Sequence, residues 1–162
     1  DMTTGSLGQG ISAACGMALS AKMDNADWYV YTVLGDGELE EGQVWEAAMY
    51  AAHYKLDHLI AFVDNNGLQI DGPISQVMSS LPISEKFKAF GWHVINVNGH
   101  NMNELHCAIE EAKQVKDSPS VVIMKTIKGK GVKETENKVG WHGKAPSEEQ
   151  CVQFVKEVQE AE

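Results

Sequence analysis

The sequence contains no arginine, and its 13 basic residues are all lysines. Acidic residues outnumber them, with 23 Asp and Glu side chains and a formal net charge of −10 at pH 7. Proteins that wrap nucleic acid need an excess of positive charge, and arginine makes the best bidentate contacts to phosphates and bases. The composition therefore predicts no nucleic-acid partner.

Cysteines and long apolar runs are also scarce. The three cysteines, Cys15, Cys107 and Cys151, are an odd number without the spacing of a metal site, which favours a reducing, cytoplasmic setting. No apolar run approaches the roughly 18 residues of a membrane span, and no stretch has the pattern of a signal peptide. We therefore expect no membrane partner.

The length and apolar content are those of one domain. The 162 residues, 43% of them hydrophobic, suffice for one buried core, so a single domain over residues 1–162 is predicted. The chain opens at Asp1 with Met2 behind it, which predicts a domain that is incomplete at its N-terminus and belongs to a longer protein.

Strand-like and helix-like segments alternate along the chain. This alternation predicts an α/β fold in three layers, α/β/α, with a mostly parallel sheet. Continuous apolar runs indicate strands that are covered on both faces. Residues 126–145 lack periodicity, which is typical of a functional or mobile segment. The expected strands are 28–34, 58–63, 91–98 and 120–125, and the expected helices are 10–23, 40–54, 102–116 and one that starts at a capping box of Ser147 and Gln150.

Two polar loops follow the first two expected strands. Gly35-Asp36-Gly37 ends the first strand, and Asp64-Asn65-Asn66-Gly67 ends the second. If these strands are parallel, both loops lie at the carboxyl edge of the sheet, where open α/β sheets bind ligands. Asp36 and Asn66 would then offer the oxygen ligands that Mg²⁺ prefers. Alternatively, Gly35–Gly37 is an ordinary turn and Asn66-Gly67 is the turn of a β-hairpin, and the residues alone leave these alternatives open.

A divalent cation would also let this acidic chain bind a phosphate ligand. Two like unit charges 4 Å apart repel by about 4 kcal/mol at an effective dielectric constant of 20. A cation between Asp36 and a diphosphate replaces that repulsion with two attractions. The negative charge that argues against nucleic acid is therefore compatible with a metal-bridged diphosphate.

Four separated motifs occur in a fixed order along the chain. They are Thr3-Thr4-Gly5-Ser6-Leu7-Gly8-Gln9-Gly10, Gly35-Asp36-Gly37-Glu38-Leu39-Glu40-Glu41-Gly42, Asp64-Asn65-Asn66-Gly67-Leu68-Gln69-Ile70-Asp71-Gly72, and Lys128-Gly129-Lys130-Gly131 with Trp141-His142-Gly143. In the centre, 27 residues (38–64) separate Gly35-Asp36-Gly37 from Asn65-Asn66. This arrangement resembles the transketolases over essentially the whole chain, above all the N-terminal subunit of split, two-gene bacterial transketolases.

The resemblance implies a site for thiamine diphosphate and a divalent metal, Mg²⁺ or Ca²⁺. Asp36, the side chain of Asn66 and the backbone carbonyl of Leu68 would hold the metal. The residues implied in cofactor binding are Gly5, Ser6, Leu7, Gly37, Asn66, Ile70 and His142, with the Gly37 backbone at the diphosphate and residues 5–7 and 70 around the thiazolium ring.

The resemblance also implies an activity and partners. The family transfers a two-carbon ketol unit from a ketose phosphate to an aldose phosphate in the pentose phosphate pathway, and His142 matches a catalytic histidine near the reacting carbons. Glu41 and Glu46 match acidic residues at the subunit interface. The implied partner is the C-terminal transketolase subunit with the pyrimidine-binding domain, in a homodimer or heterotetramer.

The sequence departs from the family in two places. Roughly a hundred residues that precede the first motif in the family are absent, and so is the pyrimidine-binding domain, which predicts that the isolated chain is inactive. Lys133-Glu134-Thr135 replaces small and apolar residues. Two alternative functions remain: another thiamine enzyme, such as deoxyxylulose phosphate synthase or a ketoacid dehydrogenase subunit, or a non-catalytic fragment that keeps the fold and the subunit interface.

Overall fold

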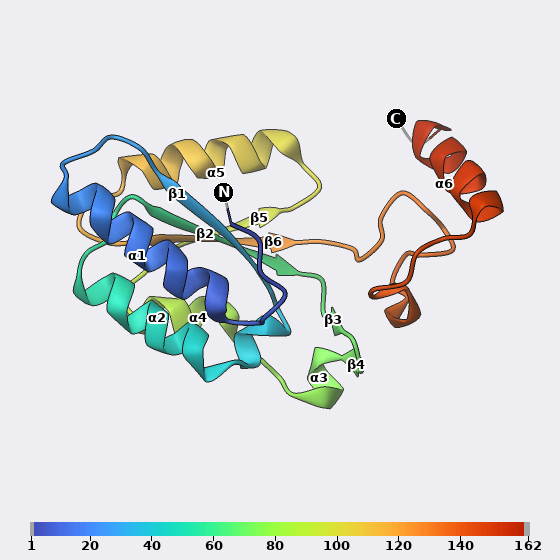
Figure 1. Cartoon of the computed structure of the whole chain (residues 1–162), viewed down its shortest axis with the longest axis horizontal. Helices are drawn as coiled ribbons and strands as arrows, with labels where there is room; N and C mark the ends of the chain where they lie inside the picture. The colour runs from blue at the N-terminus through green and yellow to red at the C-terminus, as the bar shows by residue number, and fades with distance from the viewer. Residues whose placement is uncertain (1, 161–162) are drawn as a thin grey trace.

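Four parallel strands form the central sheet of the chain, and their carboxyl ends lie at the same edge (Figure 1). The computed structural model describes residues 2–160. Gly35 lies opposite Asp64, and Asn65 and Asn98 both align with Lys125. The expected parallel sheet is therefore confirmed. In spatial order the strands are β1 (Val30–Gly35), β2 (Leu59–Asn65), β6 (Ser120–Lys125) and β5 (His93–Asn98).

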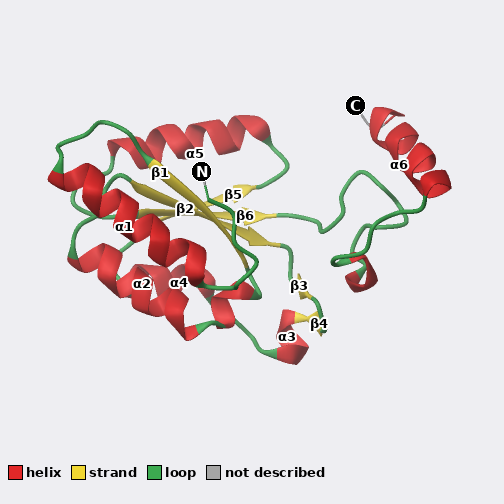
Figure 2. Ribbon diagram, viewed as in Figure 1, coloured by secondary structure: helices red, strands yellow, loops and turns green. Residues whose placement is uncertain are grey.

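Helices cover both faces of this sheet, as Figure 2 shows in red, so the predicted three-layer α/β/α architecture is confirmed. One face carries three helices and the other face carries one. Within residues 2–160, no helix combines the length and the apolar composition needed to cross a membrane. The three helices are α1 (Gln9–Met23), α2 (Gly42–His53) and α4 (Ile83–Ala89), and the single helix is α5 (Met102–Gln114).

The larger part of the core lies between the sheet and α1, α2 and α4. Phe87 of α4 is fully buried there, and its ring lies 5.2 Å from that of Trp45 and 5.3 Å from that of Trp92. A smaller cluster under α5 contains Ile60 and Val122. Both tryptophans pack in or against this core.

Strand β1 differs from the expected strand that is covered on both faces. The side chains of Tyr31 and Val33 remain 49% and 69% exposed. The single helix on their side, α5, packs against β5 and β6, at the other edge of the sheet. One face of β1 is therefore open among the described residues.

Several short elements surround the carboxyl edge. The expected helix 40–54 is divided, because Glu41 adopts an extended conformation between a short 3-10 helix and α2. The antiparallel pair β3–β4 turns at residues 70–71, so Asn66-Gly67 is not the turn of a hairpin with β2. These elements are η1 (Glu38–Glu40), β3 (Leu68–Gln69), β4 (Gly72–Pro73) and α3 (Ile74–Val77).

The C-terminal segment leaves the sheet edge after β6 and extends away from it, ending in α6 (Glu148–Glu160) (Figure 1). Ser147 and Gln150 form the predicted capping box, with reciprocal hydrogen bonds of 3.0 and 3.2 Å. The ring of Phe154 packs on that of Trp141, in the 3-10 helix η2 (Val139–Trp141), at 5.5 Å. This segment is thus mainly packed on itself.

Candidate functional site

The two polar loops lie next to each other at the carboxyl ends of β1 and β2. The backbone N–H of Asp36 donates a hydrogen bond to the carbonyl of Asp64 at 3.1 Å. In return, the Asp36 carboxylate accepts a hydrogen bond from the backbone N–H of Gly67. The predicted proximity of these loops is therefore observed, because adjacent parallel strands end in register.

Asp36 is a buried carboxylate that forms no salt bridge among the described residues. Its side chain is 1% exposed. The pKa of Asp36 is raised, mainly by burial and also by the charge of Asp64. Hydrogen bonds from the N–H groups of Gly67 and Gly37 and the charge of Lys125 lower this pKa in part. A buried charge of this kind is stabilised by a cation.

Asn66 and Leu68 flank Gly67, whose N–H bonds to Asp36, and they carry further oxygen atoms. The side-chain oxygen of Asn66 accepts a hydrogen bond of 2.9 Å from the N–H of Leu68, so the amide faces back over its own loop. Pro73 is opposite Leu68 in the β3–β4 pair and has no N–H to donate to the Leu68 carbonyl. One carboxylate, one amide and one carbonyl form an oxygen donor set that fits Mg²⁺ or Ca²⁺.

The first motif is held against the Asp36 loop. Gly5, Ser6 and Leu7 are exposed residues just before α1, and Leu7 is 57% exposed. Gly8 follows them with a φ of 80°, a backbone conformation that favours glycine. Its N–H donates a hydrogen bond of 2.8 Å to the carboxylate of Glu38, directly after the Asp36 loop.

Gly37 and Ile70 lie at the boundary between the Asp36 loop and the β3–β4 pair. A Cβ on Gly37 would lie 2.9 Å from the Cβ of Gln69, so a side chain here would collide with the neighbouring loop. Gln69 therefore restricts position 37 to glycine, and the approach of the Gly37 backbone to the diphosphate stays a prediction. Ile70 is 61% exposed in the turn between β3 and β4.

His142 is not brought together with these loops. It is an exposed residue directly after η2, and its N–H bonds to the carbonyl of Val139. Among the described residues, no hydrogen bond joins residues 128–160 to the loops at Asp36 and Asn66. The role of His142 therefore stays a prediction.

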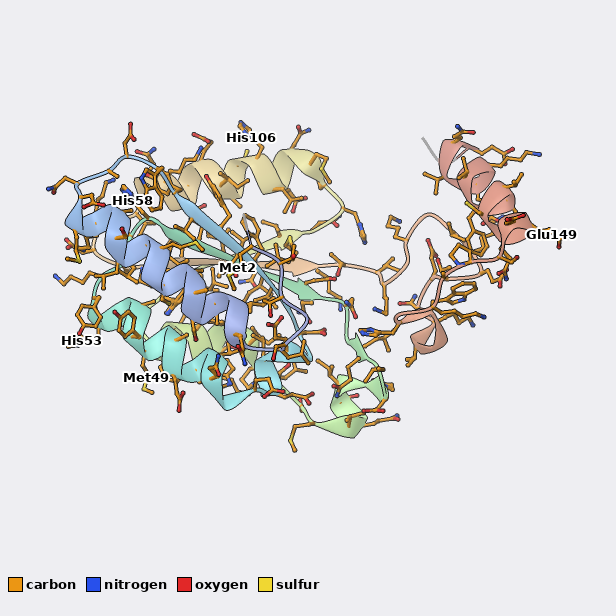
Figure 3. All side chains as sticks on the ribbon, viewed as in Figure 1. Met2, Met49, His53, His58, His106 and Glu149 are labelled. Atoms are coloured by element: carbon orange, nitrogen blue, oxygen red, sulfur yellow. The ribbon has the colours of Figure 1, made fainter. Side chains whose placement is uncertain are left out.

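The other histidines do not converge on a second site. His53 lies in α2, His58 in the turn before β2 and His106 in α5, on separate parts of the molecule (Figure 3). His93 bonds to Glu111 at 2.8 Å, and His100 accepts a hydrogen bond from the N–H of Ile127. No group of three His, Cys, Asp or Glu side chains that could hold a metal ion occurs within residues 2–160. None of these five histidines is buried.

Some residues around the site were missed in the sequence. Glu38 and Glu40 belong to an acidic run that is typical of a solvated helix start, yet each contacts another loop. Thr126 donates a hydrogen bond to the carboxylate of Asp64 and so ties the end of β6 to β2. The only signal in the sequence for Glu38 and Glu40 was that they follow Asp36 closely along the chain. No sequence pattern indicated a role for Thr126.

Curated relatives of this chain are subunits of split transketolases and complete transketolases. A 6-deoxy-6-sulfo-D-fructose transketolase subunit from a Clostridium species is 49% identical over 98% of this chain and 58% of its own length. An apulose-4-phosphate transketolase subunit from Phocaeicola vulgatus is 42% identical over 99% of the chain and 57% of its length. Human transketolase is 46% identical, and the match covers 98% of this chain but 25% of that protein. The chain thus spans little more than half the length of its two subunit relatives.

A solved structure shares the fold. The transketolase of Campylobacter jejuni superposes with a TM-score of 0.87 at 34% identity, over 98% of this chain and 25% of that one. The family model for the transketolase thiamine diphosphate binding domain matches residues 1–159. Since that match spans nearly the whole sequence, the chain belongs to the family of transketolase thiamine diphosphate-binding domains.

Proposed function

We propose that this chain supplies the diphosphate side of the active site of a thiamine diphosphate- and Mg²⁺-dependent transketolase. The enzyme would transfer a two-carbon ketol unit from a ketose phosphate to an aldose phosphate. The observation that carries the proposal is the buried carboxylate of Asp36, which forms no salt bridge among residues 2–160 and lies in the loop next to that of Asn66 at one sheet edge, within a chain of this family.

The oxygen donors fit the metal and the diphosphate. Asp36, the amide oxygen of Asn66 and the Leu68 carbonyl would hold Mg²⁺ or Ca²⁺, and the metal would bridge the acidic chain to the diphosphate. The backbone at Gly37 would approach the phosphates. The bound cofactor supplies the electron sink needed to break and form the carbon–carbon bond.

The remaining predicted residues would surround the reacting end of the cofactor. Gly5, Ser6 and Leu7 would line one side of the thiazolium ring, and the exposed side chain of Ile70 would pack from the other. His142 would donate a hydrogen bond from an imidazole N–H to a hydroxyl or developing oxyanion of the sugar. That role requires the segment after β6 to turn toward the loops in the assembled protein.

We further propose a partner chain that carries the pyrimidine-binding domain. Two relatives are named as transketolase subunits, and this chain spans 58% and 57% of their lengths. Glu41 and Glu46 are exposed and available for a subunit interface, in a homodimer or a heterotetramer. One relative is named for a sulfonated ketose and the other for a ketose phosphate, so the names select no single sugar. The proposed substrates remain the sugar phosphates that the family resemblance implies.

Fluorescence titration and a transfer assay test the proposal. The complete protein, assembled with its partner, is titrated with thiamine diphosphate in the presence and absence of Mg²⁺ while tryptophan emission is followed. We expect saturation that depends on Mg²⁺, and sugar-phosphate products from xylulose and ribose phosphates. Turnover of pyruvate instead would identify a different thiamine enzyme. Equal binding of thiamine diphosphate with and without Mg²⁺ would contradict the metal-bridged site.

A non-catalytic subunit is the second candidate. The observation that favours it is the C-terminal segment, in which Lys133-Glu134-Thr135 departs from the family and His142 lies without a hydrogen bond to the site loops. This candidate predicts a stable complex with the partner and no sugar-phosphate product. Detection of product from the assembled complex would exclude it.

A further inference from the structure

Glu38 joins two loops that are far apart in the sequence. One carboxylate oxygen accepts the N–H of Gly8 at 2.8 Å, and the other accepts the N–H of Gly35 at 3.1 Å. Gly8 is buried and is the N-cap residue of α1, in a left-handed backbone conformation. As a glycine it has no side chain with which to cap the helix. Glu38 therefore fixes the end of the loop that carries residues 5–7 against the end of β1.

Glu40 makes the corresponding connection on the other side. Its carboxylate accepts a hydrogen bond of 2.9 Å from the side-chain amide of Gln69. Gln69 follows Leu68 directly and packs against Gly37, where no Cβ could be accommodated without displacement. Glu40 thus ties η1 to the loop that presents the Leu68 carbonyl.

We propose that Glu38 and Glu40 are positioning residues that hold three loops in the arrangement that binds the cofactor. The loops are residues 3–8, 35–37 and 66–69, and all three meet at η1. This inference rests on the proposed function. Neither carboxylate is assigned a contact with the cofactor, so each acts through the loop that it holds.

Charge and position predict opposite effects for these residues. Both carboxylates add negative charge close to the site of an anionic diphosphate, so charge alone predicts tighter binding when either is neutralised. Loss of hydrogen bonds to a charged group instead loosens the loops and weakens binding. The sign of the change therefore separates the two explanations.

The first experiment compares Glu38→Gln with the parent, each in the complete protein with its partner. Dissociation constants are measured for thiamine diphosphate and for inorganic diphosphate, both at fixed Mg²⁺. The amide retains a single acceptor oxygen, so we expect thiamine diphosphate affinity to fall on the order of tenfold. Inorganic diphosphate makes no use of residues 5–7 and depends only on the 35–37 and 66–69 loops, so its affinity should fall less than that of thiamine diphosphate.

The second experiment uses the fact that Glu40 accepts one hydrogen bond, from Gln69, whereas Glu38 accepts two. Glu40→Gln keeps an acceptor oxygen for Gln69, whereas Glu40→Ala removes it. We expect Glu40→Ala to weaken both ligands, because it frees the Leu68 loop, and Glu40→Gln to restore affinity close to that of the parent. Glu85→Gln removes the same charge from an exposed position on α4 and is the matched control.

The outcomes distinguish this inference from the proposed function. A parent protein that shows no Mg²⁺-dependent binding of thiamine diphosphate overturns the proposed function. A parent that binds, together with a Glu38→Gln variant that binds thiamine diphosphate as tightly or more tightly, overturns the positioning role. Equal losses for both ligands in Glu38→Gln would also overturn it, since general destabilisation acts on both. Circular dichroism of the apo-proteins identifies variants that have not folded. If Glu40→Ala does not fold, the proposal is tested with Glu38→Gln and Glu40→Gln alone.

Discussion

The carboxylate of Asp36, just beyond β1, accepts a hydrogen bond from the backbone N–H of Gly67, beyond the end of β2. This bond fixes the two loops relative to each other before any ligand binds. The charge of Asp36 is compensated by the backbone N–H groups of Gly37 and Gly67 and by the charge of Lys125, and it forms no salt bridge among residues 2–160. The site is therefore organised in advance for a cation, and the following predictions test that organisation.

Asp36→Asn should remove most of the metal-dependent affinity. The amide keeps an oxygen for one of the backbone N–H groups but removes the charge, so we expect thiamine diphosphate affinity at fixed Mg²⁺ to fall on the order of a hundredfold. Tryptophan fluorescence titration of the assembled protein measures this loss. Asp27→Asn, an exposed aspartate before β1, is the control and should bind like the parent. Equal binding by both variants would contradict the metal bridge.

Asn66→Asp should have a smaller effect that depends on the metal concentration. The new carboxylate still accepts a hydrogen bond from Leu68 and still offers an oxygen to the metal. However, it adds a negative charge next to Asp36 and the diphosphate. We expect a loss of affinity at low Mg²⁺ that is largely recovered at high Mg²⁺. Titrations with thiamine diphosphate at a series of Mg²⁺ concentrations test this. A loss of affinity that is the same at every Mg²⁺ concentration would argue against Asn66 as a metal ligand.

The stability of the apo-protein should depend on pH through the ionisation of Asp36. Burial raises the pKa of this carboxyl above its ordinary value of 3.8, so the folded state holds the proton more tightly than the unfolded chain does. Its ionisation therefore costs stability as the pH rises from below 3.8 through the raised folded value. We expect the melting temperature of the parent to fall relative to Asp36→Asn over that window, as thermal unfolding at several pH values would show.

Saturating Mg²⁺ and thiamine diphosphate should reverse this trend. A bound cation stabilises the ionised carboxylate, so ligand stabilisation of the parent should grow as the pH rises above the raised pKa and should be small in Asp36→Asn. A constant difference between the two proteins over the whole pH range would show that Asp36 does not titrate as expected.

Cys15 should resist thiol reagents that modify the other two cysteines. Its side chain is 3% exposed in α1, and burial raises the pKa of the thiol to about 11. At pH 8 about one thousandth of this group is thiolate, whereas Cys107 and Cys151 are exposed. Titration with a disulfide reagent should release two equivalents rapidly and a third only after denaturation. Rapid release of all three would contradict the packing of α1.

Much of the fold could be predicted because its strands are continuous apolar runs between clear loop signals. The strand 120–125 coincides with β6, and α1 differs from the expected helix by a single residue at its start. Helix α4 was missed because seven residues give too few turns for a periodic pattern, although Ile83 and Phe87 lie on one face. The exposed face of β1 could not be predicted, because the cover of a strand depends on where a distant helix packs.

The centre of the candidate site was predictable for a different reason. Asp36 and Asn66 each follow a strand, and parallel neighbours bring such residues together. The contacts of Glu38, Glu40 and Gln69 connect loops about 30 residues apart and have no local signal. Likewise, no pattern indicates how the chain from Lys128 to His142 runs after β6, since its path depends on irregular turns.

The unpaired outer edge of β1 has a practical consequence for producing residues 2–160. Within residues 2–160 the strand pairs only with β2, so peptide groups along its outer side remain free to hydrogen-bond, next to the exposed Tyr31 and Val33. Bare strand edges with apolar side chains recruit further copies and drive aggregation. A lysine in place of Val33 would add a repelling charge on that strand, without touching the loops at Asp36 and Asn66, and should improve solubility.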